Sequence, residues 1–173
     1  MNVLIVGQGG REHAMAWKLS LSNKVDTVYV APGNGGTANE NKCINIDIAV
    51  NDFLALEKLV IEKEINLIVI GPEDPLVNGI KDHFQNKNVK VFGPDKAGAK
   101  LEGSKIYAKK FMFENDIPTG RAEFFSDANL AKKYINTIDF PIVLKADGLA
   151  AGKGVLVTKD PQEATQWIED VMN

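Results

Sequence analysis

Two lysines stand at and within a glycine-rich stretch near the end of the chain, Phe140–Lys159, which reads FPIVLKADGLAAGKGVLVTK. Lys145 follows the first apolar run of this stretch, and Lys153 lies between two glycines. Glycines let backbone N–H groups approach an anion closely, and the two ammonium groups add positive charge. Residue types in this pattern suit the binding of a phosphate group.

Two strands must position this loop. Ile142–Leu144 and Val155–Val157 are short apolar runs bounded by glycines, so we predict strand, loop and strand. An ordinary hairpin with a flexible glycine loop is the alternative, although hairpin loops are usually shorter, at about two to five residues. The loop does not match a Walker A motif, because Asp147 stands in the place of the first glycine and Gly154 in that of the serine or threonine.

A second anion site is predicted near the N-terminus. The buried strand Asn2–Val6 runs into the glycine turn Gly7–Gly10, and a helix should follow over Arg11–Leu21. This arrangement places backbone N–H groups and the positive end of a helix dipole at one spot. We interpret His13 as a capping or solvent-facing residue rather than a catalytic one. The helix should have one apolar face, formed by Ala14, Trp17 and Leu21.

The N-terminal turn departs from the dinucleotide-binding fingerprint at two points. Gly7 and Gly9 fit the first two glycines of that pattern, but Glu12 stands in the place of the third. The next strand, Thr27–Ala31, leads into proline and glycine instead of the acidic residue that would hold a ribose hydroxyl. Both departures disfavour NAD and favour a site for a single phosphate.

Two further loops should join this edge of the sheet. Pro32–Thr37 (PGNGGT) follows the second strand, and Gly71–Asp74 (GPED) follows the apolar run Ile65–Ile70, which has the pattern of a buried parallel strand. Ligands of open α/β sheets bind at the carboxyl ends of the strands. Glu73 is either a ligand contact or an acidic residue favoured by a helix dipole, and the convergence of three strand ends favours the contact.

Shorter segments complete this first part. Cys43–Ile48 is an edge strand or an extended connection, and Val89–Phe92 is a further strand. Asn51 should cap a helix that reaches about residue 64, and Asp74 should cap the next, whose apolar face is formed by Leu76, Val77, Ile80 and Phe84. Repeated strand–turn–helix passes predict a doubly wound α/β domain with a parallel sheet over residues 1–102.

The pattern changes after residue 102. Ser104 should cap a helix that runs to about Asn115, with Ala108, Phe111 and Met112 facing inward. Lys105 lies in the first turn of that helix, where a positive charge opposes the helix dipole, so we expect a functional reason for it. Asp116–Gly120 is a break, and residues 103–120 are therefore predicted to be a connecting helix and linker.

The remaining residues, 121–173, are predicted to form part of a second domain. Ala122–Phe125 should be a strand, residues 127–138 a helix, and the glycine-rich clamp comes next. The last helix should begin at Asp160-Pro161 and run through Trp167 and Val171. Because no helix terminus or further strand follows, we expect the chain to be cut short.

The composition excludes several classes of function. The chain of 173 residues has a net charge of −3, which disfavours a nucleic-acid surface. Cys43 is the one cysteine, so an intramolecular disulfide is excluded and a reducing compartment is favoured. The longest apolar runs are too short for a signal sequence or a membrane helix. We therefore expect a cytoplasmic protein that binds neither nucleic acid nor membranes.

Five motifs stand in order along the chain: GQGGREHA from residue 7, APGNGGT from residue 31, GPEDPL from residue 71, LEGSK from residue 101 and KADGLAAGKGV from residue 145. Together they closely resemble the N-terminal part of the phosphoribosylamine–glycine ligase family, which belongs to the ATP-grasp superfamily. The resemblance covers essentially the whole chain. It implies a Rossmann-like pre-ATP-grasp domain, then the start of an ATP-grasp domain with its lid over the nucleotide.

The resemblance also implies an activity. Members of the family use ATP to activate glycine as a glycyl phosphate, and the amine of 5-phosphoribosylamine attacks it, giving glycinamide ribonucleotide, ADP and phosphate in purine biosynthesis. The implied ATP contacts are Lys105, Lys145, Asp147, Gly148, Leu149, Ala150, Ala151, Gly152, Lys153 and Gly154. The implied contacts to the phosphoribosyl substrate are Gly9, Gly10, Arg11, Glu12, Gly33, Asn34, Gly71, Pro72 and Glu73.

The family pattern leaves parts of the reaction outside these residues. The Mg²⁺ ligands and most of the glycine site are expected beyond residue 173, and no catalytic residue or metal ligand is identified in this portion. The 173-residue chain alone should not complete the reaction, and we expect a monomer. The alternatives are a related ATP-grasp carboxylase of the purine pathway and a nucleotide-binding module without catalysis, whereas a dehydrogenase is disfavoured by the failed fingerprint.

Overall fold

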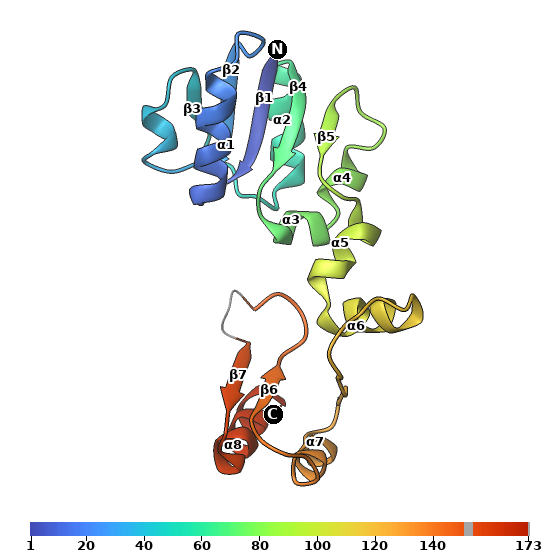
Figure 1. Cartoon of the computed structure of the whole chain (residues 1–173). Helices are drawn as coiled ribbons and strands as arrows, with labels where there is room; N and C mark the ends of the chain where they lie inside the picture. The colour runs from blue at the N-terminus through green and yellow to red at the C-terminus, as the bar shows by residue number, and fades with distance from the viewer. Residues whose placement is uncertain (151–153, 173) are drawn as a thin grey trace. The chain divides into compact units, whose positions relative to one another are not determined.

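The computed structural model describes residues 1–150 and 154–172 (Figure 1). The chain divides into two compact units, Met1–Gly103 and Ser104–Asn173. Each unit has its own hydrophobic core. Within the described ranges, no helix is both long enough and apolar enough to cross a membrane.

The first unit is built on a five-stranded sheet with the order β3-β2-β1-β4-β5. Its strands are β1 (Asn2–Gly7), β2 (Thr27–Pro32), β3 (Cys43–Asn45), β4 (Ile65–Ile70) and β5 (Lys90–Phe92). All the pairings are parallel. This order and direction confirm the predicted doubly wound α/β fold.

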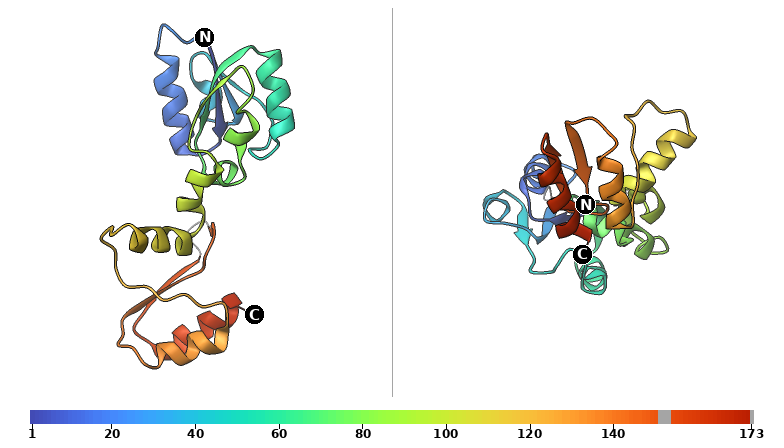
Figure 2. Two further views of the ribbon diagram at one scale, coloured as in Figure 1. Left: turned by 90° about the vertical axis from the view of Figure 1, so that its right-hand side faces the viewer. Right: turned by 90° about the horizontal axis from the view of Figure 1, so that it is seen from below.

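Helices cover both faces of this sheet. Helix α1 (Gly10–Ser20) lies on one face and α2 (Phe53–Glu62) on the other, as Figure 2 shows. Side chains alternate along β1, so Leu4 and Val6 belong to the α2 cluster while Val3 and Ile5 belong to the α1 cluster. Because both faces are buried, β1 needs a continuous apolar sequence.

The predicted apolar face of α1 is wrong. Ala14 is exposed, Trp17 is 48% exposed and Leu21 is 60% exposed. The residues that face the sheet are Glu12, Ala16 and Ser20, one turn apart. Small side chains at the last two positions let the helix backbone approach the sheet, with Met15 and Leu19 packing at the sides, while Trp17 and Leu21 lie on the outer side.

Three helix boundaries also differ from the prediction. Asp52, not Asn51, caps α2, and its carboxylate accepts a hydrogen bond from the N–H of Ala55 at 3.0 Å. The helix predicted after Asp74 is interrupted at Gly79, where φ is +92°, giving α3 (Glu73–Val77) and α4 (Ile80–His83). Asp74 lies inside α3, whose N-cap is Pro72. Two elements were not predicted, the 3₁₀ helix η1 (Thr37–Asn39) and helix α5 (Lys96–Gly103).

The described residues of the second unit form a two-stranded antiparallel sheet and three helices. They are α6 (Lys105–Glu114), α7 (Ala128–Ile135), β6 (Ile142–Lys145), β7 (Val155–Thr158) and α8 (Pro161–Met172). The antiparallel pair confirms the predicted strands on either side of the glycine-rich segment. One face of the pair packs against α7 and α8, where Ala131, Ile135, Ala164 and Ile168 are buried and Trp167 is half-buried.

Two predictions for the second unit are wrong. Ala122–Phe125 is not a strand, because Phe125 instead lies against the α7–α8 cluster and contacts the ring of Tyr134 at 5.2 Å between centroids. Helix α6 has no buried residue, so Phe111, at 37% exposed, does not face a core as predicted, and Ala108 and Met112 are only partly covered. The cap of α6 is correct, since Ser104 Oγ accepts a hydrogen bond from the N–H of Tyr107 at 3.0 Å.

Candidate functional site

Three loops of the first unit meet at the carboxyl ends of β1, β2 and β4 (Figure 1). The N–H of Gly33 donates to the carbonyl of Gly7 at 3.2 Å, and the N–H of Gly71 donates to that of Val6 at 3.0 Å. The sheet hydrogen bonding therefore continues one residue past the strands. These bonds place the three predicted substrate loops side by side at one edge.

Glu12 lies beneath these loops and is only 3% exposed. Its Oε2 accepts a hydrogen bond from the N–H of Gly9 at 2.6 Å. A Cβ atom at Gly7, Gly9 or Gly71 would lie 2.5, 2.9 or 2.0 Å from the nearest atom of the Glu12 side chain. The glycines of two different loops are thus required because one buried carboxylate occupies the space beside them. The other oxygen, Oε1, has no hydrogen-bond partner among the described residues.

Arg11 and Glu73 bridge the first and third loops. The guanidinium Nη1 lies 3.3 Å from Glu73 Oε1, and the Arg11 side chain is exposed while that of Glu73 is half-buried. The hydrogen bond and charge of Glu73 raise the pKa of Arg11. The pKa of Glu73 lies below its ordinary value, chiefly because its own backbone N–H donates to the carboxylate, with the hydrogen bond from Arg11 adding to the effect. The two residues therefore form an ion pair at the open side of the loops.

The loop after β2 is fixed by an amide–hydroxyl network. Thr37 is fully buried, and its hydroxyl accepts from the N–H of Asn34 at 2.8 Å and donates to Asn45 Oδ1 at 2.7 Å. Asn34 Nδ2 also donates to the carbonyl of Gln8 at 2.8 Å, which links the second loop to the first. The predicted loop Pro32–Thr37 includes Thr37 but not its bond to Asn45, and Asn45 was missed. Asn45 lies on a separate strand, so no local pattern connects it to this loop.

The imidazole of His13 is bonded to an acidic side chain of the first unit. Its Nε2 lies 2.8 Å from Glu40 Oε1, and a Cβ at Gly36 would lie 2.4 Å from its ring. The imidazole is partly buried and supports the loop after β2, so it is not the solvent-facing side chain that the sequence suggested, and its non-catalytic role stays a prediction.

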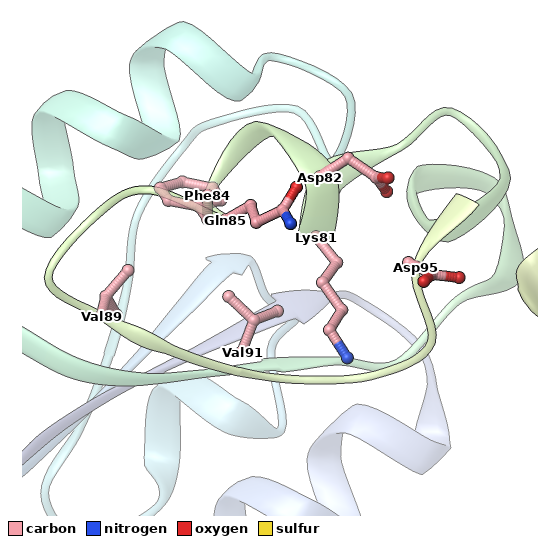
Figure 3. A pocket seen from close by; sticks show the side chains of 7 residues that line it. All are labelled: Lys81, Asp82, Phe84, Gln85, Val89, Val91 and Asp95. Atoms are coloured by element: carbon pink, nitrogen blue, oxygen red, sulfur yellow. The ribbon is translucent and has the colours of Figure 1, made fainter. Parts of the chain in front are cut away.

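A shallow cavity of about 300 Å³ lies elsewhere in the first unit, between α4 and β5 (Figure 3). Lys81, Phe84 and Val91 are among the residues that line it, and none of the predicted site residues does. The ammonium of Lys81 donates to the carbonyl of Gly93 at 2.7 Å. This cavity does not belong to the loop edge described above.

In the second unit, Lys145 lies on an exposed apolar face of the β6–β7 pair. Side chains alternate along each strand, so Lys145 shares a face with Val143, and their paired residues are Val155 and Val157. The three valines are 53%, 43% and 67% exposed, whereas Ile142 on the opposite face packs against the core. An apolar surface beside an ammonium suits a planar base joined to phosphates.

The start of the glycine-rich segment contacts the start of α6. The hydroxyl of Ser104 donates to Asp147 Oδ2 at 3.0 Å, and the N–H of Ile106 donates to Asp147 Oδ1 at 3.2 Å. In the opposite direction, the ammonium of Lys105 donates to the carbonyl of Gly148 at 2.7 Å. Two predicted ATP residues, Lys105 and Gly148, are therefore in direct contact, and Ser104 was missed as their neighbour.

The rest of the segment is described in part. The N–H of Ala146 donates to the carbonyl of Gly154 at 2.8 Å and so closes the base of the loop. Leu149 is 45% exposed and Ala150 is partly covered. The predicted contacts Ala151, Gly152 and Lys153 lie outside the described residues. Within the described part of the chain, no cluster of three or more histidine, cysteine or acidic side chains could hold a metal ion.

Family profiles match both parts of the chain. "Phosphoribosylglycinamide synthetase, N domain" matches residues 1–102, and "Phosphoribosylglycinamide synthetase, ATP-grasp (A) domain" matches residues 103–173. The phosphoribosylamine–glycine ligase of Haemophilus influenzae is 49% identical over 173 residues, covering all of this chain and 40% of that protein. A bifunctional purine biosynthetic protein of Schizosaccharomyces pombe is 48% identical over 98% of this chain and 22% of its own length.

Solved structures give the same relationship. The crystal structure of phosphoribosylamine–glycine ligase from Thermotoga maritima matches with a TM-score of 0.71 and 34% identity, over 96% of this chain and 38% of that one. An N5-carboxyaminoimidazole ribonucleotide synthetase in complex with ADP matches with a TM-score of 0.76 but 16% identity, which shows the shared fold alone. The chain thus spans about 40% of the length of the ligases it matches. It belongs to the phosphoribosylglycinamide synthetase family.

Proposed function

We propose that this chain is part of an ATP-dependent ligase that joins glycine to 5-phosphoribosylamine and releases glycinamide ribonucleotide, ADP and phosphate through a glycyl phosphate. The observation that carries the proposal is the match of the whole chain, at 49% identity, to a protein named phosphoribosylamine–glycine ligase. The geometry of the two units supports a division of work. Residues 1–102 would bind the phosphoribosyl substrate, 103–120 would connect, and 121–173 would cover the nucleotide.

The loop edge of the first unit suits a phosphorylated sugar. The N–H of Gly9 already donates to Glu12, so the phosphate would be met by the next backbone N–H groups of α1. A Cβ at Gly10 or Gly35 would meet no atom within 4 Å, so both loops present open backbone at this edge. Arg11 would supply positive charge, while the carboxylate of Glu73 would accept hydrogen bonds from sugar hydroxyl or amine groups.

The second unit suits ATP. The exposed face of Val143, Val155 and Val157 would pack against the adenine, and Lys145 on that face would reach the phosphates. Lys105 would add a second ammonium. Phosphoryl transfer depends mainly on positioning and on neutralising charge at the transferred group, and these lysines would contribute both.

Mg²⁺ is the proposed cofactor, and it would neutralise further charge on the ATP phosphates when bound. The described residues of this chain offer it no cluster of ligands. Its proposed ligands therefore lie outside the residues described here, and the contribution of this chain would be to orient the nucleotide. We further propose that the protein acts as a cytoplasmic monomer on small molecules, without nucleic-acid or membrane partners, in keeping with its net charge of −3 and single cysteine.

The test is ADP release by the protein in its natural full length, given Mg-ATP and freshly made phosphoribosylamine, with and without glycine. We expect release that depends strictly on glycine and the amine together. Release that responds only to bicarbonate would assign the protein to a related carboxylase instead. A folded chain that binds ATP but releases no ADP would be a nucleotide-binding module without catalysis.

A further inference from the structure

The first turn of α6 has an unusual charge. Helix N-termini favour acidic side chains, yet α6 begins with Lys105 and has no acidic residue in its first turn. The acidic side chain at this helix terminus comes from a residue distant in the sequence, Asp147. Asp147 places one carboxylate oxygen 3.2 Å from the N–H of Ile106 and the other 3.0 Å from the hydroxyl of Ser104. A residue of the glycine-rich segment thus acts as the acidic cap of α6.

The contact is reciprocal, because each segment binds the other. Asp147 accepts hydrogen bonds from residues 104 and 106, while the ammonium between them, on Lys105, donates to the carbonyl of Gly148 at 2.7 Å. Gly148 has a φ of +84°, a backbone conformation that residues other than glycine rarely adopt. The position of the Lys105 ammonium and the backbone at Asp147 and Gly148 are therefore set together.

The carboxylate that makes this contact is ionised at neutral pH. Partial burial raises the pKa of Asp147, but hydrogen bonds from the N–H of Ile106, the hydroxyl of Ser104 and neighbouring backbone groups outweigh it and hold the pKa below its ordinary value. An ionised carboxylate has the same sign of charge as the phosphates of ATP, so direct contact between them would be repulsive. Any favourable contribution of Asp147 to ATP binding must therefore come through the residues to which its carboxylate is hydrogen-bonded.

We propose that Asp147 is a positioning residue for ATP, holding Lys105 and the start of the glycine-rich segment in the arrangement that presents the ammonium to the phosphates. This inference rests on the proposed function, since it requires that Lys105 contact the nucleotide. It differs from the family-based expectation that Asp147 itself is an ATP contact. In this arrangement, the carboxylate acts through Lys105.

The test is a double-mutant cycle on ATP affinity, measured by calorimetry with the protein in its natural full length. Asp147→Ala should weaken ATP binding about tenfold, and Lys105→Met should weaken it by about tenfold or more, the usual effect of losing hydrogen bonds to charged groups. In the Lys105→Met background, Asp147→Ala should change affinity by less than about twofold, because the two residues act as one unit. Asp147→Asn keeps an oxygen acceptor and should restore most of the affinity.

Asp127 provides a matched control. It caps α7, where its carboxylate accepts a hydrogen bond from the N–H of Leu130 at 2.9 Å, and this bond is local to α7. Asp127→Ala should destabilise the fold as much as Asp147→Ala does, yet leave ATP affinity unchanged. Equal losses of affinity in both variants, or additive losses in the cycle, would overturn the inference.

The two proposals can fail separately. A wild-type protein that does not bind ATP would overturn the proposed function together with this inference. A wild-type protein that binds ATP, with the same affinity in Asp147→Ala, would overturn the positioning role alone.

Discussion

The predicted ligand surfaces of the two units differ in how far their residues already contact one another. In the first unit, the loops are joined to one another by their own side chains and backbone, with Glu12, Asn34 and Thr37 occupying the space between them. In the second unit, the face that includes Lys145 is bare, and the valines around it are exposed. One surface is assembled before any ligand arrives, whereas the other has apolar area still to be covered.

This difference indicates which residues should contribute to the stability of the fold and which to the affinity for a ligand. The bonds that join the loops of the first unit are already formed without a ligand, so the residues that make them contribute to the stability of the fold. An exposed apolar face gains from burial, at roughly 25 cal/mol per Å² removed from water. We therefore expect substitutions at the loop edge to change stability, and substitutions on the β6–β7 face to change affinity.

The largest effect is expected for Gly7→Ala, which tests the assembled edge. A Cβ here would lie 2.5 Å from Glu12 Cγ, and φ at this residue is +134°. Overpacking and backbone strain together should lower the free energy of unfolding by about 2–4 kcal/mol in urea titrations. Gly10→Ala is the control, because a Cβ there meets nothing within 4 Å, and it should change stability by less than about 1 kcal/mol. Equal stability of the two variants would contradict an edge packed around Glu12.

An intermediate effect is expected for Lys145→Met, which tests the bare face. Loss of a charge-assisted hydrogen bond to a phosphate should weaken ATP binding by about tenfold to a hundredfold. The free energy of unfolding should stay within about 0.5 kcal/mol of the wild type, because the side chain is exposed. Lys159→Met removes an exposed lysine just beyond β7 and should leave both quantities unchanged. A stability loss in Lys145→Met without a change in affinity would reverse the comparison.

The smallest effect is expected when the pH is lowered. It tests whether the ionised carboxylate of Asp147 stabilises the second unit. The pKa of Asp147 lies below its ordinary value of 3.8, so the carboxylate stabilises the second unit above that pH and loses its contribution as the pH falls below it. The protection of the β6 and β7 amides against hydrogen exchange, expressed relative to the intrinsic exchange rate at each pH, should fall over this range. Asp147→Asn should weaken the pH dependence, and the change should be slight because the group is exposed. An unaltered acid response in this variant would assign the effect to other carboxylates.

Much of the fold could be predicted where one physical demand dominates. β1 and β4 are buried on both faces, so their sequences are almost continuously apolar and easily recognised. The phase of α1 could not be predicted, because close packing on the sheet selects Ala16 and Ser20 over the more apolar Trp17. A local pattern also could not show that Phe125 packs against α7 and α8 outside any strand.

The candidate sites likewise combine features that a local sequence pattern predicts with contacts that it cannot predict. Glycine-rich loops at strand ends could be recognised locally, and the structure brings those of β1, β2 and β4 together. The side-chain bonds of both sites could not be predicted, since Arg11 and Glu73 of the first unit lie 62 residues apart in the sequence and Ser104 and Asp147 of the second lie 43 apart. The roles of the individual residues toward ATP and the phosphoribosyl substrate remain predictions, to be tested by the variants above.

The distribution of tryptophan gives the molecule two separate optical probes. Trp17 lies on the outer side of α1 in the first unit, and Trp167 is half-buried beside the α7–α8 cluster in the second. The sequence contains no other tryptophan. Replacing either indole by phenylalanine would leave a fluorescence signal from one unit alone. Emission and quenching in the two single-tryptophan proteins would then report the unfolding of each unit on its own.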